Sequence, residues 1–304
     1  MSIQLRSACL LLLFSTFLPA TGNGEQKTVP SAETLRNLSH EDPQWLLVQP
    51  HLPNPATASP ASLEMAADVL RARRFPEDAL EYYNFALQKG GQEATLVNKL
   101  GVTELEMRNV VAARLYFQRV VRLKRKDAQG WNNLGAVECL EGNYGRAISD
   151  YSRAIKLDKD KNKNSAAFHS NLGTALIEVK DYVGARKQYE IALRLDPELY
   201  EHDGATGLTA RLLSPEDEAR YCFEMARLYA ERKDETNMFH YLTRASEGGF
   251  DVLTEMSSDK VLASYRKDPR VLLLVRNAQA LRSGRSIAQI KGDLPPLPID
   301  SANK

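Results

Sequence analysis

The feature that most constrains the fold of this chain is a regular spacing of alanine and aromatic residues. The alanines lie 34, 34 and 38 residues apart, at Ala79, Ala113, Ala147 and Ala185. An aromatic residue follows each alanine four positions later, and a small or β-branched residue comes three positions after that. Spacings of four and three keep these positions on one face of a helix. A period near 34 residues therefore predicts helix-turn-helix units that stack into a solenoid.

A second element lies at a fixed distance before each alanine. It is a pair whose second member is small, and it reads Ala66-Ala67, Leu100-Gly101, Leu134-Gly135 and Leu172-Gly173. A small residue at this position lets two helices approach closely. Because one helix pair cannot bury its apolar face alone, we expect the units to be stable only when stacked.

The third unit carries the whole pattern, with Trp131, Leu134-Gly135, Ala147 and Tyr151. These residues resemble the tetratricopeptide repeat, whose pattern is W-x2-L-G-x2-Y followed by A-x3-F and P. The resemblance covers residues 60–197 as four repeats that begin near 60, 94, 128 and 166. It implies an all-α fold, a right-handed α-α superhelix.

Downstream, the pattern weakens. Residues 198–218 read as an irregular connector, and a degenerate fifth repeat fits residues 219–250, where Met238 replaces the alanine and predicts a splayed helix pair. We expect a helical C-terminal cap up to residue 283, because the segment after Phe250 resembles the tail of some bacterial repeat proteins. Residues 284–304 contain Pro295-Pro296-Leu297-Pro298 and read as a disordered tail.

The first residues predict export. Arg6 precedes an apolar run from Ala8 to Leu18, and the small residues Ala20-Thr21-Gly22 follow, so residues 1–22 have the composition of a signal peptide. Cleavage and retention as an anchor both remain open, and the location is periplasmic or secreted. Residues 23–59 are rich in proline and polar residues, which predicts a flexible linker.

Composition and motifs argue against several function classes. The 40 basic and 39 acidic residues nearly cancel, so nothing indicates nucleic-acid binding. The chain has no glycine-rich phosphate loop and no histidine or cysteine cluster at metal spacing, so we expect no cofactor, no metal and no enzymatic activity. We expect Cys139 and Cys222 to be buried thiols without a disulfide.

The solenoid leaves one face of each first helix free of the packing positions, and we expect this face to be the concave side. It is uncharged in the second, third and fourth units, whereas the first unit offers Glu64, Asp68 and Arg71 there. An uncharged groove of amide and aliphatic groups suits an extended peptide or an amphipathic helix of a partner protein. The candidate partner-binding residues are Thr95, Asn98, Val102, Leu105, Gln129, Asn132, Ala136, Cys139, Ala167, Ser170, Thr174 and Ile177.

The sequence thus predicts an exported, non-enzymatic scaffold that binds another protein. One alternative is a structural accessory subunit of an envelope machine, such as a pilus or secretion assembly, that packs through its edges. A second alternative is an enzyme on a helical scaffold. A third alternative is that the twelve candidate residues only contact solvent and that the partner binds on the convex side or at an edge.

Overall fold

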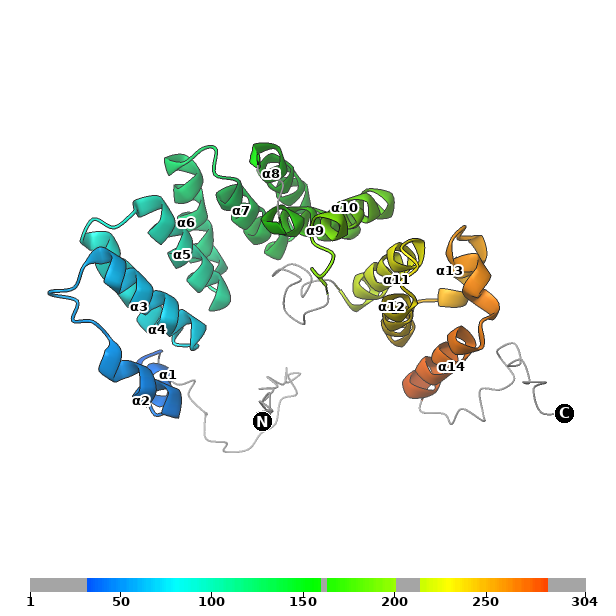
Figure 1. The fold of residues 1–304 in the computed structure, drawn as a ribbon, viewed down its shortest axis with the longest axis horizontal. Coiled ribbons are helices and arrows are strands. Elements are labelled where there is room, and N and C mark those ends of the chain that lie inside the picture. The colour runs from blue at the N-terminus through cyan, green and yellow to red at the C-terminus, as the bar shows by residue number, and fades with distance from the viewer. Residues whose placement is uncertain (1–31, 160–162, 201–213, 284–304) are drawn as a thin grey trace, which may run out of the picture. The chain divides into compact units, whose positions relative to one another are not determined.

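The computed structural model describes residues 32–159, 163–200 and 214–283 (Figure 1). Within these ranges the secondary structure is helical, with turns and no strand. The chain divides into two compact units, one up to Gln49 and one from Pro50 onward. The expected signal peptide and the expected C-terminal tail lie outside the described residues. Among the described helices, none is long and apolar enough to cross a membrane.

The first unit contains two short helices where a flexible linker was expected. They are α1 (Ala32–Ser39) and α2 (Pro43–Val48), followed by the 3-10 turn η1 (Gln49–His51). Asp42 caps α2 by accepting a 2.7 Å hydrogen bond from the Gln44 N–H. The structure thus has helices where the sequence predicted a flexible linker. Pro43 favours the start of α2, because proline at the first position of a helix costs no hydrogen bond.

The second unit begins with four antiparallel helix pairs in which each helix lies beside its partner (Figure 1). The pairs are α3 (Pro60–Ala72) with α4 (Pro76–Gln88), α5 (Glu93–Glu106) with α6 (Val110–Leu123), α7 (Ala128–Leu140) with α8 (Tyr144–Leu157), and α9 (Lys163–Glu178) with α10 (Tyr182–Leu195). Each first helix starts within three residues of its predicted position. The predicted helical solenoid is confirmed.

The glycines of the repeated pair fit under the repeated aromatic ring. A Cβ atom added to any of them would overlap the ring carbons of the partner helix. The distances to the nearest ring carbon would be 2.7 Å at Gly101 (Phe117), 2.8 Å at Gly135 (Tyr151) and 2.6 Å at Gly173 (Tyr189). Contact at this range is repulsive, so glycine is required for the two helices of a pair to approach as closely as they do.

One turn geometry closes every pair. The second residue after each first helix has a positive φ, and the N–H of the residue that follows it donates to a carbonyl of the last helical turn, a Schellman arrangement. The residues with positive φ are Arg74, Arg108, Gly142, Lys180 and Lys233. Because Lys233 belongs to the fifth pair, this pair turns as the others do. Met238 is fully buried, so the splaying expected from it does not occur.

The fifth pair and the cap complete the second unit. Helices α11 (Pro215–Glu231) and α12 (Glu235–Glu247) are followed by α13 (Val252–Ser258), the 3-10 turn η3 (Leu262–Lys267) and α14 (Pro269–Ser283). Helix α11 starts four residues earlier than predicted, because Pro215 occupies its first position and Ser214 caps it. Apolar residues of the cap join the same core cluster as α11 and α12.

Candidate functional site

A line of amide side chains connects the first helices of three successive repeats. Asn133 Nδ2 donates to Asn98 Oδ1 at 2.9 Å, so the line joins α7 to α5. Asn171 Nδ2 donates to Asn132 Oδ1 at 2.9 Å and joins α9 to α7. Within α7, Asn132 Nδ2 donates to Asn133 Oδ1 at 3.3 Å. We call these four asparagines the amide ladder. The ladder face is the side of α5, α7 and α9 that carries it, together with the matching side of α3.

The ladder first serves to hold repeats together. Its three members on α7 and α9 are buried, and a buried amide without partners would be destabilising by about 1–3 kcal/mol. The asparagines satisfy one another, and Gln129 Nε2 adds a further 2.8 Å bond to Asn133 Oδ1. At its α5 end the ladder is less covered, since Asn98 is only partly buried and Gln129 is exposed.

Charged residues continue the line toward α3. Lys99 Nζ lies 2.6 Å from Asp68 Oδ2 and 2.7 Å from Glu64 Oε1, and Tyr83 donates to Asp68 at 2.6 Å. Burial lowers the pKa of Lys99, but its hydrogen bonds to Asp68 and Glu64 outweigh this and raise the pKa overall. Arg71 pairs with Glu106 at 3.1 Å. The charges expected at the first repeat therefore pair across the seam between α3 and α5.

At the fourth repeat the ladder face is covered by the chain itself. Tyr200 follows α10 and its hydroxyl donates to Ser170 Oγ at 3.0 Å. Its ring meets the Tyr189 ring edge-on, with centroids 6.3 Å apart and planes at 82°. Thr174 Oγ1 lies 3.2 Å from the Tyr189 hydroxyl. Ser170 and Thr174 are consequently buried.

The twelve predicted partner-binding residues fall into three groups. Gln129 is exposed, and the partly buried group is Thr95, Asn98, Val102 and Ala167. The buried group is Leu105, Asn132, Ala136, Cys139, Ser170, Thr174 and Ile177. Leu105, Cys139 and Ile177 belong to core clusters between successive repeats, so their assignment to a binding surface is wrong. They lie near the end of each first helix, where it packs against the next repeat.

Two residues of this face were missed by sequence reasoning. Lys99 stands one position before Leu100, the same position that Asn133 and Asn171 occupy in later repeats. Aligning the repeats at this position would have found it. Tyr200 lies outside the repeated pattern, and no local signal predicts that it folds back onto α9.

In the part of the chain that the structure describes, Cys139 and Cys222 are free thiols and both are buried. Burial raises the pKa of each thiol to about 12, so both are neutral and unreactive at pH 7. In the described residues, no group of three or more histidine, cysteine or acidic side chains is placed to hold a metal ion.

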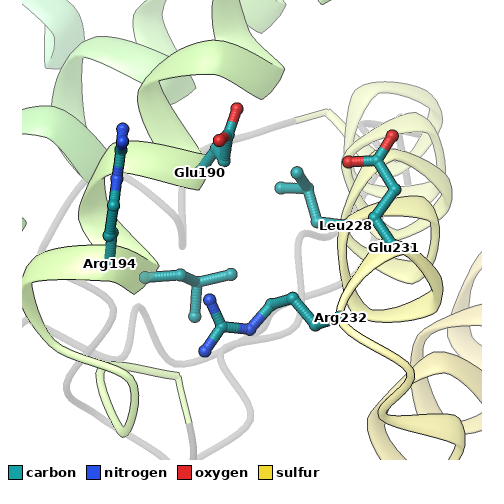
Figure 2. Close-up of a pocket in the computed structure, with 6 residues that line it drawn as sticks. Glu190, Arg194, Leu228, Glu231 and Arg232 are labelled. Atoms are coloured by element: carbon teal, nitrogen blue, oxygen red, sulfur yellow. The ribbon is translucent and has the colours of Figure 1, made fainter.

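A cleft lies between α10 and α11, at the joint of the fourth and fifth repeats. In Figure 2, Glu190 and Arg194 extend from α10, and the opposite wall is lined by Leu228 and Glu231 of α11 and by Arg232, which caps the end of that helix. Leu193 completes the lining. Two carboxylates and two guanidinium groups balance one another, so the cleft favours neither anions nor cations. We therefore interpret it as a loosely packed joint.

Comparison with known proteins supports the repeat assignment. Residues 64–130 and 141–200 match the family model of the tetratricopeptide repeat. Superkiller protein 3 of Schizosaccharomyces pombe is 38% identical over 61 residues, which are 20% of this chain and 4% of that protein. The chain thus matches only a small part of that relative.

Solved structures share the helical arrangement. The Pseudomonas aeruginosa pilF structure superposes with a TM-score of 0.51 and 16% identity, covering 77% of this chain and 97% of that one. A tetratricopeptide repeat protein from Parabacteroides merdae gives a TM-score of 0.42 and 15% identity, covering 78% of this chain and 80% of that one. At such identities the likeness concerns the fold alone.

Proposed function

We propose that this chain, which contains tetratricopeptide repeats, is a non-enzymatic scaffold that holds a segment of a partner protein on its ladder face. The segment is an extended peptide or an amphipathic helix, and it lies across α3, α5 and α7. The observation that carries the proposal is the uncovered part of this face around Asn98 and Gln129, between the charged cluster on α3 and the covered fourth repeat.

The chemistry of the uncovered part suits a peptide. Within the described residues, no hydrogen bond engages the side-chain N–H groups of Asn98 or the side-chain oxygen of Gln129, which leaves a donor and an acceptor near each other on adjacent first helices. Thr95 and Val102 add a hydroxyl and an aliphatic group on the same face of α5. A peptide backbone offers a carbonyl for the donor and an N–H for the acceptor, and its side chains can pack against the aliphatic groups.

Charge favours one orientation of the segment. The cluster of α3 and α5 holds three carboxylates, on Glu64, Asp68 and Glu106, against the two cations Arg71 and Lys99. The remaining negative charge attracts a lysine or arginine at the end of the segment that lies over α3.

Site-specific photocrosslinking tests the proposal. A benzophenone amino acid is placed at Gln129 on α7 or, as the matched control, at Ser149 on α8, since both positions are exposed in the same repeat. In the cells that make the protein, we expect a discrete protein adduct at position 129 and none at 149. Thr95→Arg on α5 should lower the yield at 129, whereas Gln118→Arg on α6 should not. Equal adducts at 129 and 149 would contradict the proposal.

One observation favours the edge-packing alternative. Val69 on α3 is 43% exposed, although the equivalent residues of later repeats, Val137 and Ala175, are fully buried against the preceding repeat. Met65 is 69% exposed, although the residues at its repeat position in the third and fourth repeats, Asn133 and Asn171, are buried. The α3 edge thus resembles an unfilled seam. If the protein assembles through it, Met65→Glu should abolish association measured by light scattering, while Val111→Glu on the exposed side of α6 should not. Association that survives Met65→Glu excludes this edge.

Export is part of the proposal, and the composition of residues 1–22 supports it. The experiment fuses these residues to a reporter that folds only outside the cytoplasm. We expect reporter activity with the native residues and its loss when Leu11, Leu12 and Leu13 are replaced by aspartate, because charge in the apolar run prevents membrane insertion. Activity that persists with the aspartates would contradict export by this route.

A further inference from the structure

The inner lining of the fourth repeat differs from that of the second and third. Ser170 stands two positions before Leu172, the same repeat position as Asn98 and Asn132. In the second and third repeats this position carries a ladder amide. In the fourth, Ser170 accepts a hydrogen bond from the hydroxyl of Tyr200. A residue of the connector therefore lies where a partner segment on the ladder face would continue.

Tyr200 is held at both its hydroxyl and its ring. The hydroxyl of Ser170 anchors its polar end, and the fully buried ring of Tyr189 meets its ring edge-on. The preceding residue, Leu199, is buried against Ala166 and Ala192, which fixes the backbone at this point. Burial raises the pKa of Tyr200 well above its usual value, so the phenol stays protonated and can donate.

The contact comes from the longest of the connections between described helix pairs. The connections from α4 to α5 and from α6 to α7 are the four-residue segments Lys89–Gln92 and Lys124–Asp127, which lead directly into the next helix. The connection from α10 to α11 is the 19-residue segment Asp196–Ser214. Its first turn carries Leu199 and Tyr200 onto α9 before the chain proceeds to the fifth repeat.

We propose that the ladder face of the fourth repeat is a pocket for an aromatic side chain, which the chain fills with its own Tyr200, and that Tyr200 therefore sets the C-terminal limit of the surface open to a partner. Only the limit on the partner surface rests on the proposed function, and the aromatic pocket does not. A bound segment contacts α3, α5 and α7 and stops before α9.

The pocket is tested with p-cresol, which is the tyrosine side chain in free form. In the full chain, Tyr200→Ala should lower the melting temperature, and saturating p-cresol should restore roughly 2–4 °C of the loss. The wild type, whose pocket is filled, should not respond. Tyr116→Ala removes a partly buried tyrosine from α6 and is the matched control that should not respond either. If Tyr200→Ala fails to fold, Tyr200→Ser removes the same ring but keeps a hydroxyl group.

A comparison of p-cresol with toluene tests whether the Ser170 hydroxyl anchors the phenol. Toluene lacks the hydroxyl, so it should stabilise Tyr200→Ala less than p-cresol does, and the difference should vanish when Ser170→Ala is added. Failure of p-cresol to stabilise either Tyr200 variant beyond the wild type overturns the pocket.

The limit on the partner surface is tested with a benzophenone amino acid at Ala167 on α9. We expect no adduct in the wild type and an adduct in Tyr200→Ala. An adduct at 167 in the wild type, or none in the variant while position 129 still crosslinks, overturns the limit. Absence of adducts at both 129 and 167 with intact p-cresol binding contradicts the proposed function and leaves the pocket in place.

Discussion

The seams between the first four repeats and the joint between the fourth and fifth are built differently. At the α6–α7 seam, Val137 is fully buried in a cluster with Leu105 and Phe117, and the connector has four residues. At the joint of α10 with α11, the connector has 19 residues, and the Tyr189 and Tyr221 rings meet with centroids 5.3 Å apart.

The joint contains a buried carboxylate paired with two cations, and the α6–α7 seam has a buried carboxylate too, since Arg114 of α6 lies 3.5 Å from Glu138 of α7. The carboxylate of Glu224 is 2% exposed and lies 3.2 Å from an Arg186 nitrogen and 2.9 Å from an Arg220 nitrogen. Arg220 in turn stacks over the Tyr182 ring at 4.2 Å. Two clefts are lined by residues of both α10 and α11. Both contacts thus include a buried ion pair, and the joint differs in its packed tyrosine rings and its long connector.

The largest expected effect comes from emptying a regular seam. Tyr151→Ala removes a fully buried ring that packs on Gly135, so we expect a loss of about 3–5 kcal/mol in the free energy of unfolding, measured by urea denaturation. Tyr116→Ala, at a partly buried position, should lose much less. A similar loss for both would show that the repeats do not depend on this contact.

The joint should be the part most sensitive to charge. Arg220→Ala leaves the buried Glu224 with one cation instead of two, and we expect a loss of about 2–3 kcal/mol. Hydrogen exchange should then rise in α11 more than in α5. The control is Arg244→Ala, which breaks an exposed pair with Glu218 and should change stability by less than about 1 kcal/mol. Uniform exchange across α5 and α11 would argue against a separate joint.

A smaller effect is expected when a methyl group is added under the aromatic ring of a regular repeat. Gly135→Ala places a methyl group 2.8 Å from the Tyr151 ring and should destabilise the protein by about 1–3 kcal/mol. Gly145→Ala, on α8 of the same repeat, has open space around its Cβ and should stabilise the helix by up to about 1 kcal/mol. Thermal melting of the two variants should shift in opposite directions. Equal shifts would refute the close approach.

The smallest effect concerns pH within the third repeat. Burial and Glu138 raise the pKa of Asp150 from 3.8 to about 6, against the lowering effect of Arg153 and Arg146. Because the folded state binds this proton more tightly than the unfolded state, stability decreases as pH rises from about 4 to 6. Asp150→Asn should remove this dependence and stabilise the protein at pH 7 by about 1 kcal/mol, seen as a flatter profile of melting temperature against pH. An unchanged profile would contradict the assignment.

Repeated positions could be predicted from the sequence, and single insertions could not. The Leu-Gly and Ala-aromatic spacings predicted the helix pairs and their contacts, because one geometry recurs in each repeat. The partner-binding surface predicted from the sequence was partly wrong. Leu105 and Ile177 point toward the next repeat, and how far one repeat covers another depends on packing that a single period does not reveal. Tyr200 reaches α9 through a segment with no counterpart elsewhere in the chain, so no pattern could indicate it.

The identical turn after all five first helices makes each repeat an exchangeable module. Each module carries the same turn between its two helices, so losing or duplicating one between two short connectors would leave the Gly-ring contacts inside the remaining modules unchanged. Such a change would alter how many partner residues the protein can span, one module at a time, without a new fold having to arise.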